Sequence, residues 1–354
     1  MERTHNQNLG KGLDVGTSFV RAAEQHGQEI VYRTERNAFI DIGQADYTET
    51  MLRRSGIEYV ISEGQLYIVG NKAMEFANLL ALDARRPFSR GIISPSEKEA
   101  LPMIEMIVKA VGGSPERSGE TLYYSIPGPP VDGEANLLYH DKTVQSILQR
   151  LGFTAKPINE GLAVVFSELS HQRFTGIGLS FGGGMVNVCV AYRSVPVLRF
   201  SLAMAGDWID QTAALAVGET ASLVCALKES FLDLSKREGL SKVEQALSIS
   251  YDKLIAYVLE QLRKQAAKAI RAPELVESFT MVVGGGTALP RGFSDRFTQA
   301  LREGGFPLEI GEVLMAKDPS SCVATGALIA AQADEEDKAD EPAPASGVDR
   351  ESTA

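Results

Sequence analysis

Glycine-rich turns follow apolar, strand-like segments at three places in this chain of 354 residues. The first two, GLDVGTSFV from Gly12 and GLSFGGGMVNV from Gly178, are each predicted as a strand, a tight turn and a returning strand. The third, MVVGGGTALP, is predicted as a strand that ends in a turn at Gly284. Glycine lets the backbone turn tightly and approach another segment or a ligand closely. The recurrence therefore predicts a duplicated unit, with two lobes facing each other across a cleft.

Strand and helix patterns alternate between these turns. Segments rich in β-branched residues predict a β-meander in the first 70 residues. Helical spacing then predicts a helix from Glu97, followed by a strand at 121–128 and a helix closed by Gly152. Helical patterns also fill the segment from Asp207 to about residue 270, with no alternating strand pattern between them. We expect an α/β fold whose second lobe has a small outer part lacking strands.

Composition limits the partners and the compartment. The chain has 46 acidic and 35 basic residues, giving a formal net charge of −11, so we expect no nucleic-acid partner, because phosphate binding needs clustered Lys and Arg. Three separated cysteines and four scattered histidines disfavour a disulfide framework, a zinc site and a Ser/His/Asp triad. No apolar stretch approaches the roughly 18 residues of a membrane span. We expect a cytoplasmic protein without direct membrane insertion.

The C-terminal segment 333–354 differs from the rest of the chain. Its sequence, ADEEDKADEPAPASGVDRESTA, is acidic and has no apolar periodicity. A segment that cannot bury apolar surface does not offset the entropy lost on folding. The composition therefore predicts a disordered acidic tail over these residues.

The glycine-turn segments also carry a resemblance. GLDVGTS, LSFGGGMVNV and VVGGGTALP resemble, in order, the phosphate 1, phosphate 2 and adenosine motifs of the superfamily of actin, Hsp70 and sugar kinases. INEGLAVVFSEL and SSCVATGALIAA resemble its two interdomain helices, and YIVGNKAMEF and KDPSSCVATGA are most similar to the bacterial actin homologue MreB. The resemblance covers nearly the whole chain. It implies an actin-like two-lobed α/β fold of duplicated RNase H-like domains, with lobes at 10–157, completed by a helix at 321–332, and at 158–320.

The same resemblance implies a site for ATP and Mg²⁺ in the cleft. Asp14 would hold the water shell of the Mg²⁺ ion, and Glu160 would orient the attacking water. Alternatively, Glu160 is a helix-start carboxylate favoured by the helix dipole, and the glycines only form turns. The nucleotide-binding residues implied are Gly16, Thr17, Ser18, Gly182, Gly183, Gly184, Gly206, Gly284, Gly285, Gly286 and Thr287.

The sequence departs from the superfamily pattern at the site. Ser180 stands where the phosphate 2 motif has an aspartate that serves the Mg²⁺ shell, which leaves useful ATP hydrolysis open. Ser222 and Cys225 stand where MreB-like proteins place a Glu and a Lys that contact the adenosine. The preference for ATP over GTP or another nucleotide is therefore also open.

Two functions follow from these observations. The resemblance implies a cytoskeletal protein that binds ATP, polymerises with copies of itself, hydrolyses slowly and works with a further, unidentified protein partner. The alternative is a non-polymerising nucleotide-binding scaffold, or pseudo-ATPase, of the same fold. A sugar kinase is disfavoured by the short chain, and a chaperone of the Hsp70 type by the lack of a domain after the nucleotide domain.

Overall fold

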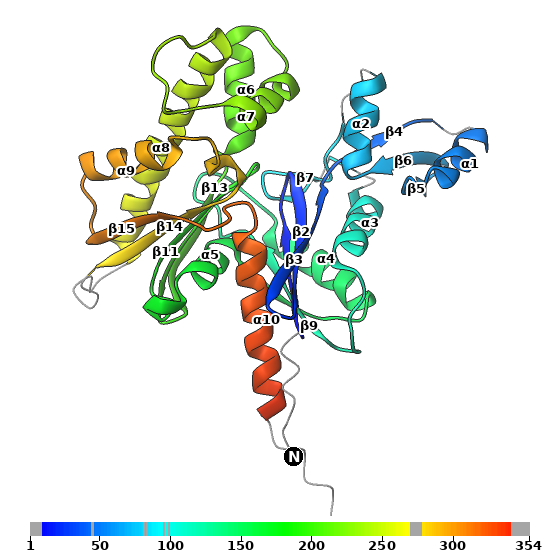
Figure 1. Ribbon diagram of the computed structural model, residues 1–354, viewed down its shortest axis with the longest axis horizontal. Coiled ribbons are helices and arrows are strands. Elements are labelled where there is room, and N and C mark those ends of the chain that lie inside the picture. The colour runs from blue at the N-terminus through cyan, green and yellow to red at the C-terminus, as the bar shows by residue number, and fades with distance from the viewer. Residues whose placement is uncertain are drawn as a thin grey trace, which may run out of the picture.

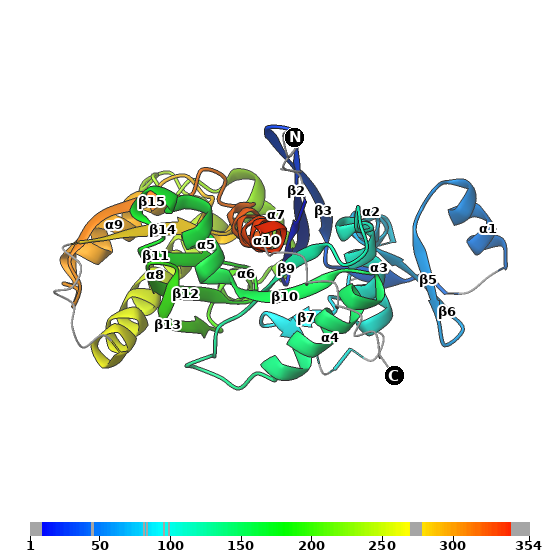
Figure 2. The ribbon, with the colours of Figure 1, turned by 90° about the horizontal axis from the view of Figure 1, so that it is seen from below.

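Two five-stranded sheets, one in each half of the chain, form the centre of the molecule (Figures 1 and 2). The computed structural model describes residues 9–43, 46–80, 82, 84–94, 96–97, 100–269 and 278–340. Helices pack against both sheets, and the cavity described below lies between the two halves. No helix of the described residues is both long and apolar enough to span a bilayer.

The first sheet has the strand order β10-β9-β1-β2-β3. Strand β1 is antiparallel to β2 and parallel to β9, and β9 is parallel to β10. Helices α3 (Ala100–Gly112) and α4 (Leu137–Arg150) bury their apolar sides in the core of this lobe, together with inward residues of the sheet such as Leu13 and Tyr124. The strands are β1 (Lys11–Val15), β2 (Phe19–His26), β3 (Glu29–Arg36), β9 (Thr121–Ile126) and β10 (Thr154–Asn159).

The outer part of the first lobe is a separate small layer. A three-stranded sheet, in the order β4-β6-β5, packs with two helices around its own apolar cluster, which includes Leu52 and Ile68. The predicted meander is therefore right for β1–β3. The strands expected within 58–70 are present as β5 and β6, but they belong to this separate sheet, and α1 precedes them. The elements are β4 (Phe39–Asp41), α1 (Asp46–Arg54), β5 (Tyr59–Ser62), β6 (Gln65–Val69) and α2 (Asn71–Leu80). The hairpin β7 (Phe88–Ser89) and β8 (Ile92–Ile93) follows.

The second sheet repeats the topology of the first. Its order is β13-β12-β11-β14-β15, so that β11, β12 and β13 correspond to β1, β2 and β3, and β14 and β15 correspond to β9 and β10. Strand β11 is antiparallel to β12 and parallel to β14, as β1 is to β2 and β9. The strands are β11 (Gly176–Phe181), β12 (Val186–Tyr192), β13 (Val195–Leu202), β14 (Phe279–Gly284) and β15 (Ile310–Met315). The duplication predicted from the glycine turns is present in the strand order.

The outer part of the second lobe is helical, as predicted. Between β13 and residue 269 the elements are α6 (Gly206–Val217), α7 (Ala221–Phe231) and α8 (Lys242–Ala269), and this described stretch contains no strand. Helix α8 buries a row of residues that includes Tyr251, Leu254 and Val258 at helical spacing in the main core of the lobe. Helix α9 (Phe293–Glu303) packs on the same core.

Two helices that approach each other through small residues lie between the sheets (Figure 1). Helix α5 (Glu160–Glu168) and helix α10 (Cys322–Asp340) pack closely, since a Cβ atom at Gly326 would lie 1.8 Å from the carbonyl oxygen of Ala163. A Cβ atom at Gly161 would likewise meet the backbone of β12 at 2.6 Å. Small residues are required here because the backbones touch.

The expected disorder of 333–354 is wrong for its first eight residues, which belong to α10. Glu335 is buried, accepts hydrogen bonds from the backbone N–H of Thr121 at 3.0 Å and from Lys338 Nζ at 2.8 Å, and pairs with Arg117. These contacts offset the cost of burying the carboxylate and fasten the end of the helix to β9. Residues 341–354 of the predicted tail lie outside the described residues.

Candidate functional site

A cavity of about 520 Å³ lies where the first glycine turns of the two sheets face each other. The first lobe contributes the turn after β1, and the second contributes the turn after β11, the helices α6 and α7, and the short 3₁₀ turn η3 (Gly286–Ala288). Most of the predicted site residues line it. They are Asp14, Gly16, Thr17, Ser18, Glu160, Gly182, Gly183, Gly184, Gly285, Gly286 and Thr287.

Two predicted residues lie behind the cavity wall. A Cβ atom at Gly206 would lie 2.5 Å from Thr287 Oγ1, and one at Gly284 would lie 2.4 Å from Cys322 Sγ. Neither glycine is among the residues that line the cavity. The absence of a side chain at both positions lets neighbouring segments pack closely beside the cavity. Direct contact of Gly206 and Gly284 with a nucleotide stays a prediction.

The two glycine turns have the same local structure. Gly16 N–H donates to the carbonyl of Phe19 at 3.0 Å, and Gly182 N–H donates to the carbonyl of Met185 at 3.0 Å. A Cβ atom at Gly183 would lie 2.3 Å from Ser18 Oγ, so the turns touch across the cavity. Consecutive backbone N–H groups in such turns suit anionic oxygens.

The carboxylates of Asp14 and Glu160 lie at the base of the cavity. Ser125 Oγ donates to Asp14 Oδ1 at 2.9 Å, and Ser180 Oγ donates to Glu160 Oε2 at 3.2 Å. Burial raises the pKa of Asp14, with Ser125 and Arg21 acting against the shift. Burial, with the negative charge of Asp14 second, raises the pKa of Glu160 to about 8.

These carboxylates fit a hard divalent cation held through water. Burial raises the pKa of both carboxyl groups, and the charge of Asp14 adds to the shift of Glu160, so a cation beside them would be stabilised. The described residues hold no cluster of three or more His, Cys, Asp or Glu placed to ligate a metal directly. Mg²⁺ suits this arrangement because it retains several waters and binds phosphate oxygens beside one or two carboxylates.

Ser180 occupies the position in β11 that Asp14 occupies in β1. Asp14 lies two residues before Gly16, and Ser180 lies two residues before Gly182, in turns of equal geometry. The duplicated fold therefore places a hydroxyl where the first lobe has a carboxylate. The second acid of the site comes from Glu160 at the start of α5, where Asn159 Oδ1 accepts from Leu162 N–H at 3.2 Å and caps the helix.

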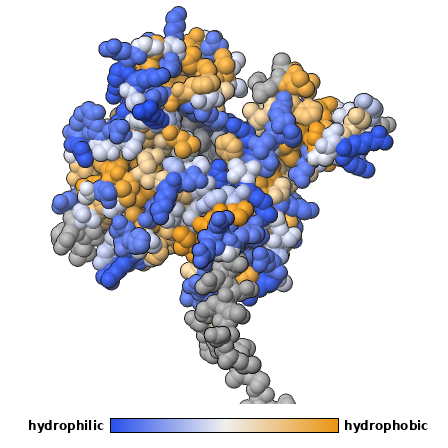
Figure 3. Space-filling view, viewed as in Figure 1, coloured by the Kyte–Doolittle hydropathy of each residue, from blue (hydrophilic) through white to orange (hydrophobic). Residues whose placement is uncertain are grey.

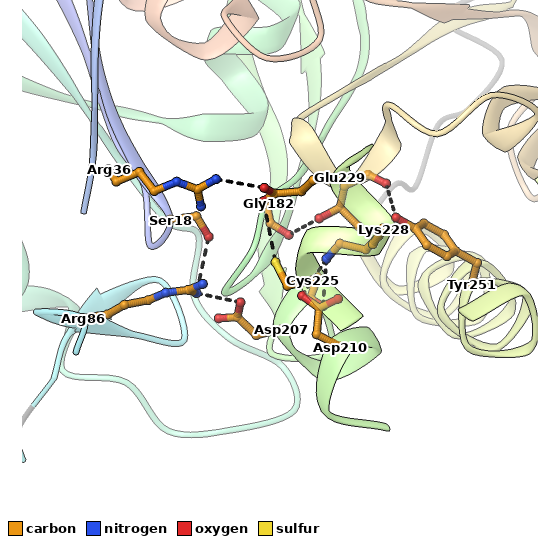
Figure 4. Close-up of polar contacts among 12 residues, drawn as sticks. Ser18, Arg36, Arg86, Gly182, Asp207, Asp210, Cys225, Lys228, Glu229 and Tyr251 are labelled. Carbon is orange, nitrogen blue, oxygen red and sulfur yellow. Dashed lines mark hydrogen bonds and ion pairs between the residues drawn. The ribbon is translucent and has the colours of Figure 1, made fainter. Parts of the chain in front are cut away.

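An ion pair between α6 and α7 also lines the cavity (Figure 4). Lys228 Nζ of α7 lies 2.7 Å from Asp210 Oδ2 of α6, and both side chains are buried. The second oxygen of Asp210 is buried and has no hydrogen-bond partner among the described residues. Tyr251 OH donates to the carbonyl of Thr287 at 3.0 Å and fixes η3 against α8.

The structure corrects the prediction for α7. Cys225 lines the cavity, but Ser222 is exposed and is not among the lining residues. Lys228, one turn after Cys225, provides the cation that Cys225 does not. The spacing of residues 225, 228 and 229 places them on one face of the helix, and this periodicity could have identified Lys228 from the sequence.

Sequence reasoning also missed three arginines. Arg21 of β2 lines the cavity and donates to Thr34 Oγ1 at 2.9 Å. Arg36 and Arg86 do not line the cavity, but each forms an ion pair with an acidic residue that does, Glu229 and Asp207 respectively. The local sequence around Arg36 and Arg86 does not indicate these acidic partners, because Glu229 and Asp207 belong to the other lobe.

Comparisons with known proteins agree with this architecture. The family model described as Volactin matches residues 9–331. Among solved structures, the MamK double helical filament has 19% sequence identity and a TM-score of 0.70, covering 92% of this chain and 98% of that chain. MreB5 of Spiroplasma citri bound to AMPPNP has 15% identity and a TM-score of 0.66, covering 93% and 98%. The ethanolamine utilization protein EutJ from Carboxydothermus hydrogenoformans has 13% identity and a TM-score of 0.53, covering 91% and 89%.

No curated protein matches the sequence. The likenesses to MamK, MreB5 and EutJ confirm the predicted actin-like α/β fold and the resemblance to MreB-like proteins. At these identities they show the fold alone. Because the Volactin model spans most of the sequence, the chain belongs to the Volactin family.

Proposed function

We propose that the protein binds ATP with Mg²⁺ in the cavity between its lobes and assembles with copies of itself into a cytoskeletal filament. The observation that carries the proposal is the contact of Ser18 with Gly183, which brings the two glycine turns together beside Asp14 and Glu160. The similarity to MreB5 bound to AMPPNP and to the MamK filament supports it. The same proposal includes a division into two lobes and a cytoplasmic location. The first lobe is 10–157 completed by 321–332, and the second is 158–320.

The residues of the chain have distinct roles in this proposal. Backbone N–H groups of the two turns hold the phosphate oxygens, and Arg21 adds positive charge beside them. Asp14 holds the water shell of Mg²⁺, which neutralises phosphate charge when bound. The unpartnered oxygen of Asp210 and the Lys228 ammonium face the nucleoside end of the cavity.

Hydrolysis is proposed to be slow. Glu160 orients the attacking water, and Ser180 contributes a hydrogen bond to Glu160 in place of a second charge near Mg²⁺. Loss of an outer-shell partner typically costs 10- to 100-fold in metal affinity or activity. The nucleotide would therefore act mainly as a ligand that joins the lobes.

Self-association has support from the surface of the second lobe. Leu215 of α6 and Phe231 of α7 are 86% and 75% exposed, and Figure 3 shows apolar residues over these outer helices. Phe231 also lines the cavity, so an apolar contact between copies of the chain at this place would lie beside the nucleotide. Assembly through this lobe would be linked to nucleotide binding if closure of the cavity orients α6 and α7.

The test combines sedimentation with nucleotide binding. Purified full-length protein is centrifuged with Mg²⁺ and ATP, ADP or no nucleotide, and phosphate release is measured in the same tubes. We expect ATP-dependent pelleting, filaments by electron microscopy and slow phosphate release. The matched variant is Gly184→Val, whose Cβ would meet Thr17 Oγ1 at 2.2 Å and Gly91 N at 2.7 Å, and it should lose nucleotide binding and pelleting.

The alternative is a nucleotide-binding scaffold that does not polymerise, and Ser180 is the observation that favours it. Nucleotide binding without pelleting at any concentration would select this alternative. Absence of binding to ATP, GTP and ADP would reject both functions.

A further inference from the structure

Two arginines of the first lobe form ion pairs with acidic residues of the second lobe across the cavity (Figure 4). Arg36 Nη2, at the end of β3, lies 2.9 Å from Glu229 Oε2 of α7. Arg86 Nη1, just before β7, lies 2.8 Å from Asp207 Oδ1 in the first turn of α6. We call these two ion pairs the clasp.

The clasp is distinct from the other charge pairs of the described residues. Those pairs lie within one lobe or tie α10 to the first lobe, whereas the clasp joins residues 10–157 to residues 158–320. The lobes are also joined by backbone hydrogen bonds, such as Val131 N–H to the carbonyl of Ser201 at 3.1 Å. The carboxylate of Asp132 also accepts hydrogen bonds from Ala203 N–H at 2.9 Å and Tyr257 OH at 2.8 Å in the second lobe. Substitution of Arg36 and Arg86 leaves all of these bonds in place and removes only the clasp.

Each arginine is held against the first glycine turn. The guanidinium of Arg36 lies 4.5 Å from the ring centroid of Phe19, and Arg86 Nη1 lies 3.4 Å from Ser18 Oγ. Phe19 and Ser18 line the cavity. The arginines are therefore positioning residues, which connect the turn after β1 with α6 and α7 without lining the cavity themselves.

The solvent exposure of the four side chains determines how strongly the two ion pairs stabilise the contact between the lobes. The side chains of Arg36 and Glu229 are 24% and 40% exposed, and those of Arg86 and Asp207 are 32% and 31% exposed. Half-exposed ion pairs stabilise a contact weakly and are screened by salt. Such pairs can open often, but they reduce the fraction of molecules in which the lobes are apart.

We propose that the clasp sets the residence time of the nucleotide, an inference that rests on the proposed ATP site. A nucleotide that contacts both lobes leaves when they separate, so breaking the ion pairs raises the population of open molecules and the rate of release. Arg36 and Arg86 thereby control nucleotide exchange through the position of the second lobe.

The experiment measures release of a fluorescent N-methylanthraniloyl ATP analogue from the full chain after addition of excess ATP. The variant R36E should raise the release rate roughly 2- to 5-fold, and R36E/R86E should raise it further. The conservative variant R36K keeps the positive charge opposite Glu229 and should stay close to the wild-type rate. The control R53E breaks an exposed pair with Glu49 inside α1 and should keep the wild-type rate.

A second measurement compares the salt dependence of nucleotide release in the wild type and in the double variant. Wild-type release should accelerate between about 0.05 and about 0.5 M NaCl, and R36E/R86E should respond less to salt. The proposal would be wrong if R36E/R86E released nucleotide at the wild-type rate, or if its release rate depended on salt as strongly as that of the wild type. If the wild type takes up no nucleotide in a direct binding assay, the proposed function is wrong and the clasp proposal falls with it.

Discussion

Ser180 Oγ donates a hydrogen bond of 3.2 Å to Glu160 Oε2. The hydroxyl stands where the first lobe places the carboxylate of Asp14 in its equivalent turn. A carboxylate at this position would face two other acids in a desolvated cavity. A hydroxyl orients Glu160 and adds no further electrostatic repulsion, so it destabilises the nucleotide-free protein less than a third carboxylate would.

Restoring the acid should change how the site depends on Mg²⁺. In Ser180→Asp we expect tighter Mg²⁺ binding and roughly 10- to 100-fold faster phosphate release, because a second carboxylate serves the ion. Without Mg²⁺ the variant should be less stable than the wild type. Ser180→Ala is the matched control, since it removes the hydrogen bond without adding charge, and it should release phosphate no faster than the wild type. Phosphate release and thermal unfolding, each with and without Mg²⁺, check the prediction.

Two glycines in helices should respond oppositely to alanine. A Cβ atom at Gly326 would lie 1.8 Å from the backbone oxygen of Ala163, so Gly326→Ala should force α5 and α10 apart and destabilise the protein by about 2–4 kcal/mol. A Cβ atom at Gly112, at the end of α3, meets nothing within 4 Å. Gly112→Ala should therefore be neutral or stabilise by up to about 1 kcal/mol. Urea unfolding of both variants provides the comparison, and equal destabilisation would contradict the packing argument.

Glu335 should make stability depend on acid pH. Lys338 and Thr121 hydrogen-bond to the carboxylate and lower its pKa to about 2, although burial alone would raise it. A pKa lower in the folded than in the unfolded protein stabilises the fold above the unfolded value of about 4.5. That contribution is lost as the pH falls from about 4.5 towards 2. Glu335→Gln should reduce stability by about 1–3 kcal/mol at pH 7 and show a smaller loss on acidification, measured by urea unfolding across this range.

His140 should make the stability of the protein depend on pH in a higher range than Glu335 does. The side chain is buried edge-on to Phe88, its nitrogens have no hydrogen-bond partner among the described residues, and burial lowers its pKa to about 4. The unfolded chain binds the proton more tightly, so stability should fall as the pH drops from about 6.5 to 4. His140→Phe should remove this component and be the more stable protein at pH 5. An identical pH profile for the two proteins would contradict this account.

The features that the sequence predicted are those encoded by short segments. The turns at Gly16 and Gly182 each lie within one hairpin, so their position and their equivalence could be recognised from local patterns alone. The helical outer part of the second lobe has its own periodicity, and it was predicted for the same reason.

The features that were missed depend on distant partners. Glu335 was assigned to a disordered tail because residues 333–340 are charged residues and alanines that carry no apolar signal, and its partner Thr121 lies more than 200 positions away. The clasp could not be predicted from short sequence segments either, since Arg36 and Arg86 pair with residues of the other lobe. Lys228 was missed because the motif was matched position by position, with Ser222 and Cys225 in place of the Glu and the Lys, rather than by helix face.

Helix α10 begins beside the cavity, where Val323 is part of the wall, and ends at Asp340 after 19 residues. At 1.5 Å per residue, its far end lies about 26 Å along the helix from Val323. The start of the described chain lies along the same helix, since a Cβ atom at Gly10 would meet Ala331 at 3.1 Å. The described residues therefore begin and end along the part of α10 that follows its contact with the cavity.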